Sequence, residues 1–139
     1  MAESKIENFN HLKIHSQYSI CEGAIKIDDL GEFSKKNKIR SLALCDTSNL
    51  CGALEFAEKI SKAGTQPIIG TQINFKIGDL AGLLPLFALN EDGYKRIMEL
   101  SSLSYLENDK SSDPHLNIQE LFHKTEGVAL FSGTIHGLF

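Results

Sequence analysis

The chain has 139 residues, of which 42% are hydrophobic and 23% charged, a composition typical of about one globular domain. Its net charge of −4 excludes a broad basic field that attracts a phosphate backbone, so any larger DNA-handling protein is expected to make most DNA contacts outside this chain. The polar tail over residues 1–8 is no secretory signal, and no apolar run approaches the ~20 residues that cross a bilayer. These features predict a soluble, cytoplasmic protein that has no membrane partner.

The three cysteines predict free thiols in a reducing cytosol. Cys21, Cys45 and Cys51 are odd in number and form no C-x-x-C pair. A thiolate metal site is the alternative interpretation, but the usual ligand spacing is missing.

Short apolar runs alternate with helical patterns along the first part of the chain. An apolar run over residues 9–14 is followed by a predicted helix over residues 28–37. Asp28 can cap the amino end of this helix, and Leu30 and Phe33 share one of its faces.

A second strand and helix follow. Residues 42–45 predict a short buried strand. Asn49 can cap the next helix, and Gly64 stands where a left-handed residue that ends a helix is expected. One face of this helix carries Leu50, Leu54, Ala57 and Ile60.

The middle of the chain predicts two further strand regions. The first covers residues 67–70 and 73–77 and is expected to be interrupted at Gly70. The second covers residues 83–89, where Pro85 favours an edge position or an irregularity, because proline cannot donate a hydrogen bond to a neighbouring strand.

The last part of the chain predicts a helix over residues 90–105, with Tyr94, Ile97, Met98 and Ser101 at helical spacing. After a polar loop, Asn117 and Glu120 resemble a capping box, and residues 128–131 predict a final strand. Alternation of strands and helices predicts an α/β fold with mainly parallel strands and helices outside the sheet.

Polar residues directly follow several predicted strands. The pairs are His15 and Ser16, Asp46 and Thr47, Thr71 and Gln72, and Ser132 and Gly133. In parallel α/β folds, side chains at the carboxyl ends of strands converge on one rim, where the chemistry lies. Each residue also has an ordinary interpretation: His15 as a hydrogen-bonded structural histidine, and Asp46 as a turn or cap residue.

Four stretches carry a resemblance to a known family: HLKIHSQYSICEGAIKI, SLALCDTSNLCGALEF, QPIIGTQINF and GVALFSGTIHG. They resemble the successive motifs of the PHP domains found at the amino terminus of bacterial DNA polymerase III alpha subunits. The resemblance implies that residues 9–139 form the N-terminal part of a PHP domain. The implied fold is a partial PHP-type (β/α) barrel with outer helices, incomplete in this chain.

Metal-binding members of this family hold divalent ions with clustered His, Asp, Glu and sometimes Cys ligands, and the ions activate water against a phosphate ester. Compared with that pattern, neutral or cationic residues stand at four ligand positions: Lys13, Thr47, Gln72 and Leu83. Thr134 stands where a cysteine or histidine is expected, whereas His15 and Glu22 are kept and Asp46 lies beside the lost histidine. The resemblance therefore implies a vestigial site made of Lys13, His15, Glu22, Asp46, Thr47, Gln72 and Thr134, with no metal, cofactor or catalytic residue expected in this chain.

Two alternatives for this site remain at the level of sequence. Lys13 can pair with Glu22 or Asp46 and replace the lost metal charge. Alternatively, the chain belongs to an autonomous metal-dependent PHP phosphoesterase, in which His15, Glu22, Asp46 and His136 regroup around one metal.

The resemblance also implies a cellular role. The parent protein is expected to be a replicative DNA-directed DNA polymerase, a nucleotidyltransferase that uses Mg²⁺ in another domain. The expected partners of this piece are the remainder of the alpha subunit and the proofreading exonuclease subunit, which it docks, while DNA is bound through other domains.

Overall fold

The computed structural model describes residues 9–108, 112–123 and 125–132. Tail residues 1–8, Thr134 and His136 therefore lie outside the described residues. In chain order the elements are α1 (Ile27–Asn37), β1 (Ser41–Thr47), α2 (Ala53–Lys62), β2 (Gln66–Ile77), β3 (Leu80–Ala88), α3 (Glu91–Leu106), β4 (Leu116–Asn117), α4 (Ile118–Phe122) and β5 (Val128–Leu130).

The predicted α/β fold is confirmed, with a sheet of mixed direction. Within the described residues five strands form one sheet in the order β1-β2-β3-β5, with β4 paired to β2 off this path. β1 and β4 run parallel to β2, whereas β3 runs antiparallel to both β2 and β5. The change of direction arises from a tight hairpin at Gly78, whose φ of 57° favours glycine, in place of a helical crossover.

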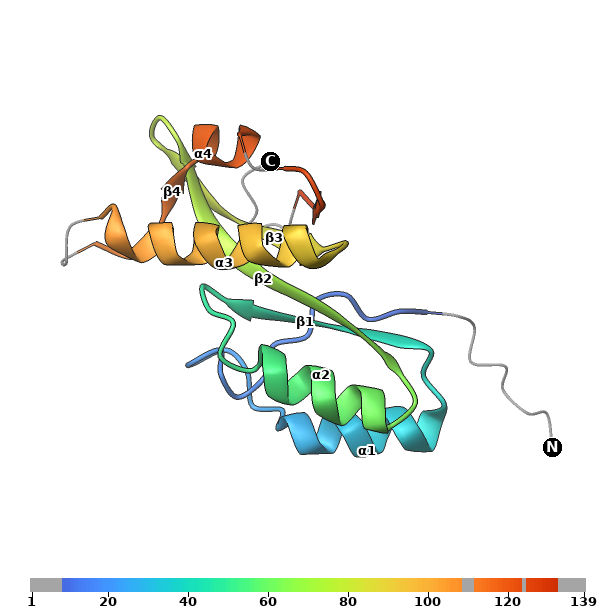
Figure 1. Cartoon of the computed structure of the whole chain (residues 1–139). Helices are drawn as coiled ribbons and strands as arrows, with labels where there is room; N and C mark the ends of the chain where they lie inside the picture. Colours follow the sequence, from blue (N-terminus) through green and yellow to red (C-terminus); the bar gives the residue numbers. More distant parts are fainter. Residues whose placement is uncertain (1–8, 109–111, 124, 133–139) are drawn as a thin grey trace.

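The helices lie along the sheet in two groups, with α1 and α2 beside β1 and α3 and α4 beside the far part of β2 (Figure 1). One core cluster joins α1 and α2 to Leu42 and Leu44 of β1 and Ile69 of β2. A second joins α3 and α4 to Ile73 and Phe75, further along β2. Because side chains two residues apart in a strand point the same way, both clusters lie on one face. The opposite face carries a smaller cluster formed by Ala43, Cys45, Phe87, Leu12, Ile68 and Ala129.

The first apolar run is not a regular strand. It lies beside β1, where His11 O and Ile14 O accept hydrogen bonds from the backbone N–H groups of Ala43 and Cys45. Its pairing with β1 is limited to a bridge between Ile14 and Leu44. The run nevertheless places His15 and the loop that follows it at the carboxyl end of β1.

Both predictions for the amino ends of the first two helices are wrong. The N-cap of α1 is Lys26, without a side-chain cap, and Asp28 lies in the first turn, where it pairs with Lys59. The N-cap of α2 is Gly52, while Asn49 lies ahead of the helix and accepts from the Cys51 N–H. Asp28 is thus engaged by a tertiary contact with α2, whereas Asn49 forms a local turn ahead of α2 instead of capping it.

The buried faces of the helices also differ from the prediction. Leu30 is buried in α1, but Phe33 is 50% exposed. The buried residues of α2 are Ala53, Phe56 and Ile60, whereas Leu54 is 73% exposed. The buried residues of α3 are Gly93, Ile97, Leu100 and Ser104, so of the predicted face only Ile97 is fully buried.

Two predictions for the strands are corrected by the pairing. β2 is continuous through Gly70, which pairs with both β1 and β3. Glycine is required here by close packing and not by a break in the strand, because a Cβ atom would lie 2.4 Å from the Phe87 ring and 2.5 Å from the Leu86 carbonyl oxygen. Pro85 lies in an internal strand between β2 and β5. The Pro85 carbonyl oxygen accepts from the Phe131 N–H, and Phe131 lies just beyond the end of β5. The N–H that proline lacks would therefore fall where the pairing between β3 and β5 ends, so no strand hydrogen bond is lost.

Other local signals are confirmed. Gly64 ends α2 with a φ of 82°. Asn117 caps α4 by accepting from the Gln119 N–H, which is the Asn117 half of the predicted capping box. The predicted helix over residues 90–105 is α3, and Asn90 caps it by accepting from the Gly93 N–H, a role that was not predicted. Within the described residues no helix is long and apolar enough to span a membrane.

Candidate functional site at the carboxyl end of the first strands

The site forms where the loop over residues 15–23 closes on the end of β1. Asp46, the penultimate residue of β1, is 1% exposed. One carboxylate oxygen, Oδ1, accepts from the Ser16 N–H at 2.6 Å and from the Ser19 hydroxyl at 2.7 Å. The other, Oδ2, accepts from the Ser16 hydroxyl at 2.7 Å. The carboxylate is therefore bound on both oxygens by the protein itself.

The two serines are in turn held by the backbone around them. Ser16 Oγ accepts from the Tyr18 N–H at 3.2 Å, and Ser19 Oγ accepts from the Thr47 N–H at 3.1 Å. The loop is tight, because a side chain at Gly23 would come within 2.0 Å of Ser16 O. Asp46, Ser16 and Ser19 thus form a buried hydrogen-bonded group, termed here the Asp46 anchor, that ties the loop to β1.

Four of the predicted site residues come together beside the Asp46 anchor. The Thr47 hydroxyl donates to Glu22 Oε2 and accepts from Gln72 Nε2 at 2.7 Å. His15 Nδ1 lies 3.9 Å from Glu22 Oε2. Within the described residues, His15 Nδ1 and Gln72 Oε1 are buried without a hydrogen-bond partner. These contacts join His15 through Glu22 and Thr47 to Gln72 at the strand ends.

The predicted pairing of Lys13 is wrong. Lys13 is exposed, and within the described part of the chain no ion pair joins it to Asp46 or Glu22. Hydroxyl and N–H donors, rather than an ammonium group, stabilise the Asp46 carboxylate. Leu83, in β3, has an apolar side chain and contributes no ligand atom, and Thr134 and His136 lie outside the described residues.

Ser19 is the functional residue that the sequence reasoning missed. Its hydroxyl contacts Asp46 and its N–H bonds to Ser16 O at 2.9 Å, which closes a turn. The available signal was the spacing of two serines three residues apart around Tyr18, a pattern suited to a local turn. Tyr18 itself leaves the site and donates to Glu55 Oε2 at 2.9 Å, and this hydrogen bond raises the pKa of Tyr18.

The donor set does not fit a multinuclear metal centre. Such a centre requires several convergent carboxylate or imidazole ligands around each ion. Among the residues described, no group of three or more His, Cys, Asp or Glu side chains is arranged to hold a metal ion. His15 and Glu22 remain as two neighbouring donors, whereas the oxygens of Asp46 are already engaged by serine donors.

Burial makes Cys45 a poor nucleophile beside this site. Desolvation raises the pKa of the Cys45 thiol from 9.0 to about 12, while Cys21 and Cys51 are exposed. Because the thiolate is the reactive form, Ellman's reagent at pH 8 is expected to modify Cys21 and Cys51 rapidly and Cys45 only after unfolding. Mass spectrometry of the labelled peptides measures this difference, and rapid labelling of Cys45 in the folded chain would contradict it.

The same shift has a defined effect on stability. The folded-state pKa of Cys45 lies above the unfolded value, so its contribution to the free energy of unfolding is fully present below about pH 9 and decreases as the pH rises toward 12. Urea titrations at pH 9 and at higher pH measure the free energy of unfolding. Between these pH values the free energy of unfolding is expected to fall less in a Cys45→Ala chain than in the unmodified chain.

Comparison with known proteins places these features in a family. The PHP domain family matches residues 11–139, which include all the described residues of the candidate site. DNA polymerase III subunit alpha of Caulobacter vibrioides is 37% identical over 99% of this chain, and that of Borreliella burgdorferi is 37% identical over 94% of it. The chain spans only 13% and 12% of the lengths of these two curated relatives.

Two solved structures share the fold. A Bifidobacterium adolescentis protein described as a metal-dependent phosphoesterase has a TM-score of 0.52 at 19% identity, over 70% of this chain and 34% of that one. An amidohydrolase from Chromobacterium violaceum with bound sulfate has a TM-score of 0.53 at 16% identity. The match covers 68% of this chain and 34% of the amidohydrolase chain. At these identities the likeness shows the fold alone, and it is consistent with a partial PHP-type barrel. Together with the matched motifs, these comparisons establish that the chain belongs to the PHP domain family and is similar to the PHP region of DNA polymerase III alpha subunits.

Proposed function

We propose that this chain is the N-terminal PHP module of a DNA polymerase III alpha subunit and that the module itself is structural rather than hydrolytic. The parent protein would be a cytoplasmic DNA-directed DNA polymerase whose Mg²⁺-dependent nucleotidyl transfer takes place in another domain. Similarity over nearly the whole chain, with coverage of about an eighth of the relatives, supports a module of a longer polypeptide. The remainder of the alpha subunit is then its first partner.

The Asp46 anchor is the observation that carries the structural role. A carboxylate has about four acceptor sites. Short hydrogen bonds from Ser16 and Ser19 fill three of those of Asp46, two on Oδ1 and one on Oδ2, which leaves about one for an ion. Opening the anchor would leave three buried donors unsatisfied, at a cost of about 1–3 kcal/mol for each donor. The arrangement therefore favours a closed, internally bonded strand end over a metal centre.

The rest of the cluster lacks the groups needed to activate water. Hydrolysis of a phosphate ester in this kind of site depends on metal ions that lower the pKa of bound water and neutralise the phosphate. Thr47 and Gln72 offer only a neutral hydroxyl and a neutral amide. The Gln72 amide nitrogen donates to the Thr47 hydroxyl, and the amide oxygen Oε1 carries no charge with which to hold an ion. His15 and Glu22 by themselves supply fewer ligands than even one tightly held ion requires.

Metal analysis combined with a hydrolysis assay tests the structural role. The full-length protein that contains this chain is compared with its His15→Ala/Glu22→Ala variant for bound Zn²⁺ and Mn²⁺ and for hydrolysis of bis(p-nitrophenyl) phosphate. Both proteins are expected to hold the same amount of metal and to show the same background hydrolysis, while both extend a primer.

The variant provides the control for metal bound elsewhere in the full-length protein. Metal ions and turnover that are present in the unmodified protein and absent from the variant would replace our proposal with a metal-dependent PHP phosphoesterase. Absence of primer extension by the unmodified protein would refute the assignment to a polymerase.

We also propose that the module docks the proofreading exonuclease subunit. The resemblance of its motifs to those of polymerase PHP domains supports this role. Chemical cross-linking of the full-length protein with purified exonuclease, followed by mass spectrometry, is expected to join the exonuclease to exposed lysines such as Lys26, Lys62 or Lys95. Cross-links confined to the polypeptide beyond residue 139 would refute docking on this module.

A further inference from the structure

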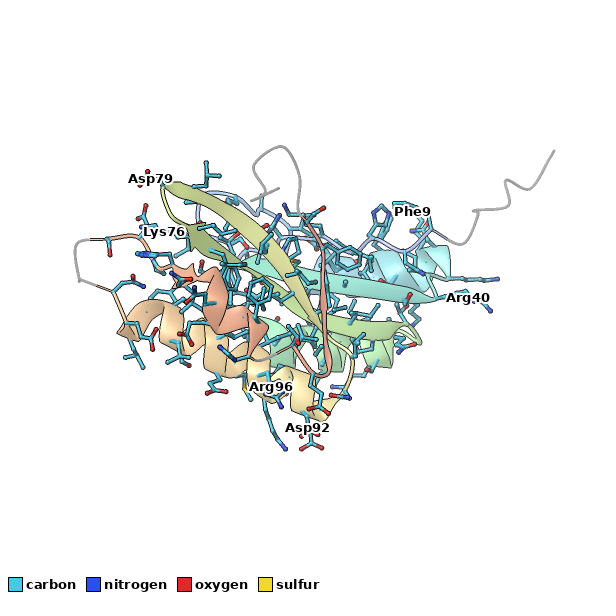
Figure 2. All side chains as sticks on the ribbon, turned by 90° about the horizontal axis from the view of Figure 1, so that it is seen from above. Phe9, Arg40, Lys76, Asp79, Asp92 and Arg96 are labelled. Carbon is cyan, nitrogen blue, oxygen red and sulfur yellow. The ribbon has the colours of Figure 1, made fainter. Side chains whose placement is uncertain are left out.

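Basic residues are concentrated in one short stretch of an acidic chain. Four of the 14 lysine and arginine residues occur within residues 35–40, and no acidic residue occurs between Glu32 and Asp46. Lys35, Lys36, Lys38 and Arg40 are all exposed, and this group is termed here the basic end. Figure 2 shows Arg40 projecting at one end of the molecule, while Lys76 and Asp79 lie toward the other.

The backbone of the basic end is held firmly by its neighbours. Ile39 N–H bonds to Ser34 O at 3.1 Å, and Ile39 O accepts from the Thr65 hydroxyl at 2.8 Å. Arg40 O accepts from the Gln66 N–H at 2.9 Å. Because the side chain of Ile39 packs against the core, Lys38 and Arg40 are displayed outward from a fixed loop. A fixed backbone reduces the entropy cost when such a surface binds a partner.

Stabilisation of α1 explains only part of the positive charge at the basic end. Lys35 and Lys36 lie in the last turn of α1 and Lys38 is its C-cap residue, where cations interact favourably with the helix dipole, but this effect is weak at exposed positions and is screened by salt. Other lysines have acidic partners: Lys59 pairs with Asp28, and Lys95 with Glu91 at 2.8 Å. Within the described ranges no ion pair to a carboxylate engages Lys35, Lys36 or Lys38.

We propose that the basic end contacts the phosphate backbone of duplex DNA. The inference rests on the proposed polymerase function and adds to it a DNA contact inside the module. Ammonium and guanidinium groups form charge-assisted hydrogen bonds with phosphate oxygens. A polyelectrolyte such as duplex DNA, with one charge per ~1.7 Å, also rewards adjacent cations through the release of condensed counterions, a gain that a sparsely charged acidic protein does not offer.

The chain's net charge of −4 confines the contact to this end. Because the contact is made to phosphates and not to base edges, it is independent of base sequence. The test measures binding of the full-length protein to a labelled duplex by fluorescence anisotropy at several salt concentrations. A Lys35→Gln/Lys36→Gln/Lys38→Gln variant is compared with a Lys26→Gln/Lys76→Gln/Lys95→Gln variant, which removes the same charge outside the basic end.

The first variant is expected to reduce the slope of log Kd against log salt by about 0.9 for each phosphate that the protein no longer neutralises, whereas the second keeps the original slope. Equal slopes in all three proteins, or equal reductions in the two variants, would overturn the proposal. Binding of the same proteins to poly-glutamate is measured in parallel. If the first variant kept the original DNA slope but no longer bound poly-glutamate, the basic end would be a site for an acidic protein segment, and the DNA proposal would be overturned. Primer extension by the unmodified protein tests the polymerase assignment independently. If primer extension is present and one of these results is found, the DNA contact is refuted while the polymerase assignment stands.

Discussion

Replacing Asp46 with alanine is expected to lower the free energy of unfolding of the chain by about 4 kcal/mol, because it leaves the Ser16 N–H and the Ser16 and Ser19 hydroxyls buried without an acceptor. Removal of the acceptor also releases the loop over residues 15–23 from β1. Urea unfolding followed by circular dichroism measures the change.

Asp46→Asn and Asp79→Ala are the matched controls for this effect. Asparagine keeps one acceptor oxygen, so Asp46→Asn is expected to cost less than Asp46→Ala. Asp79 is an exposed carboxylate, and its replacement is expected to change the free energy of unfolding by no more than about 0.5 kcal/mol. If Asp46→Ala unfolded at the same urea concentration as Asp79→Ala, the Asp46 anchor would have no role in stability.

Replacing Phe56 with alanine is expected to cost about 4 kcal/mol through the cavity that it creates. Phe56 is fully buried in the cluster where α1 and α2 meet β1, against Ile27, Leu30, Leu42, Leu44 and Ile60. These neighbours belong to three different elements, so the surrounding structure can only partly collapse into the space.

Phe122→Ala is the control for the Phe56 substitution, because it removes the same atoms from a side chain that is 68% exposed in α4. We expect this change to alter stability by no more than about 0.5 kcal/mol. Equal midpoints for the two variants in urea would show that the core between α1, α2 and β1 is not packed as described.

Local chemistry explains which elements were predicted correctly. Gly64 at a left-handed position, and Asn90 and Asn117 at helix starts, act through backbone groups within three residues of themselves. Such signals need no distant partner, so a single sequence contains them. The alternation of strands and helices that predicts the α/β class is likewise a local pattern repeated along the chain.

Helix faces and strand neighbours were predicted less well for the same physical reason. The helix α2 has apolar side chains on more than one side, and packing against α1 and β1 selects Phe56 and Ile60 rather than Leu54. Pro85 favours an edge on its own, but the end of β5 places its missing N–H where no partner is required. Each outcome depends on residues far away in the sequence.

The candidate site also combines features that the sequence determines with features that depend on distant contacts. By itself the sequence determined which donors and charges are present, among them His15, Glu22, Asp46, Thr47 and Gln72. That substitutions removed metal ligands is what the family resemblance implies, and it stays a prediction. Only the tertiary structure decided that the Asp46 carboxylate is bound by Ser16 and Ser19 instead of Lys13. The physical reason is that residue identity sets the available charges and donors, whereas the pairing of a buried carboxylate is set by which donors the closed loop brings within hydrogen-bond distance.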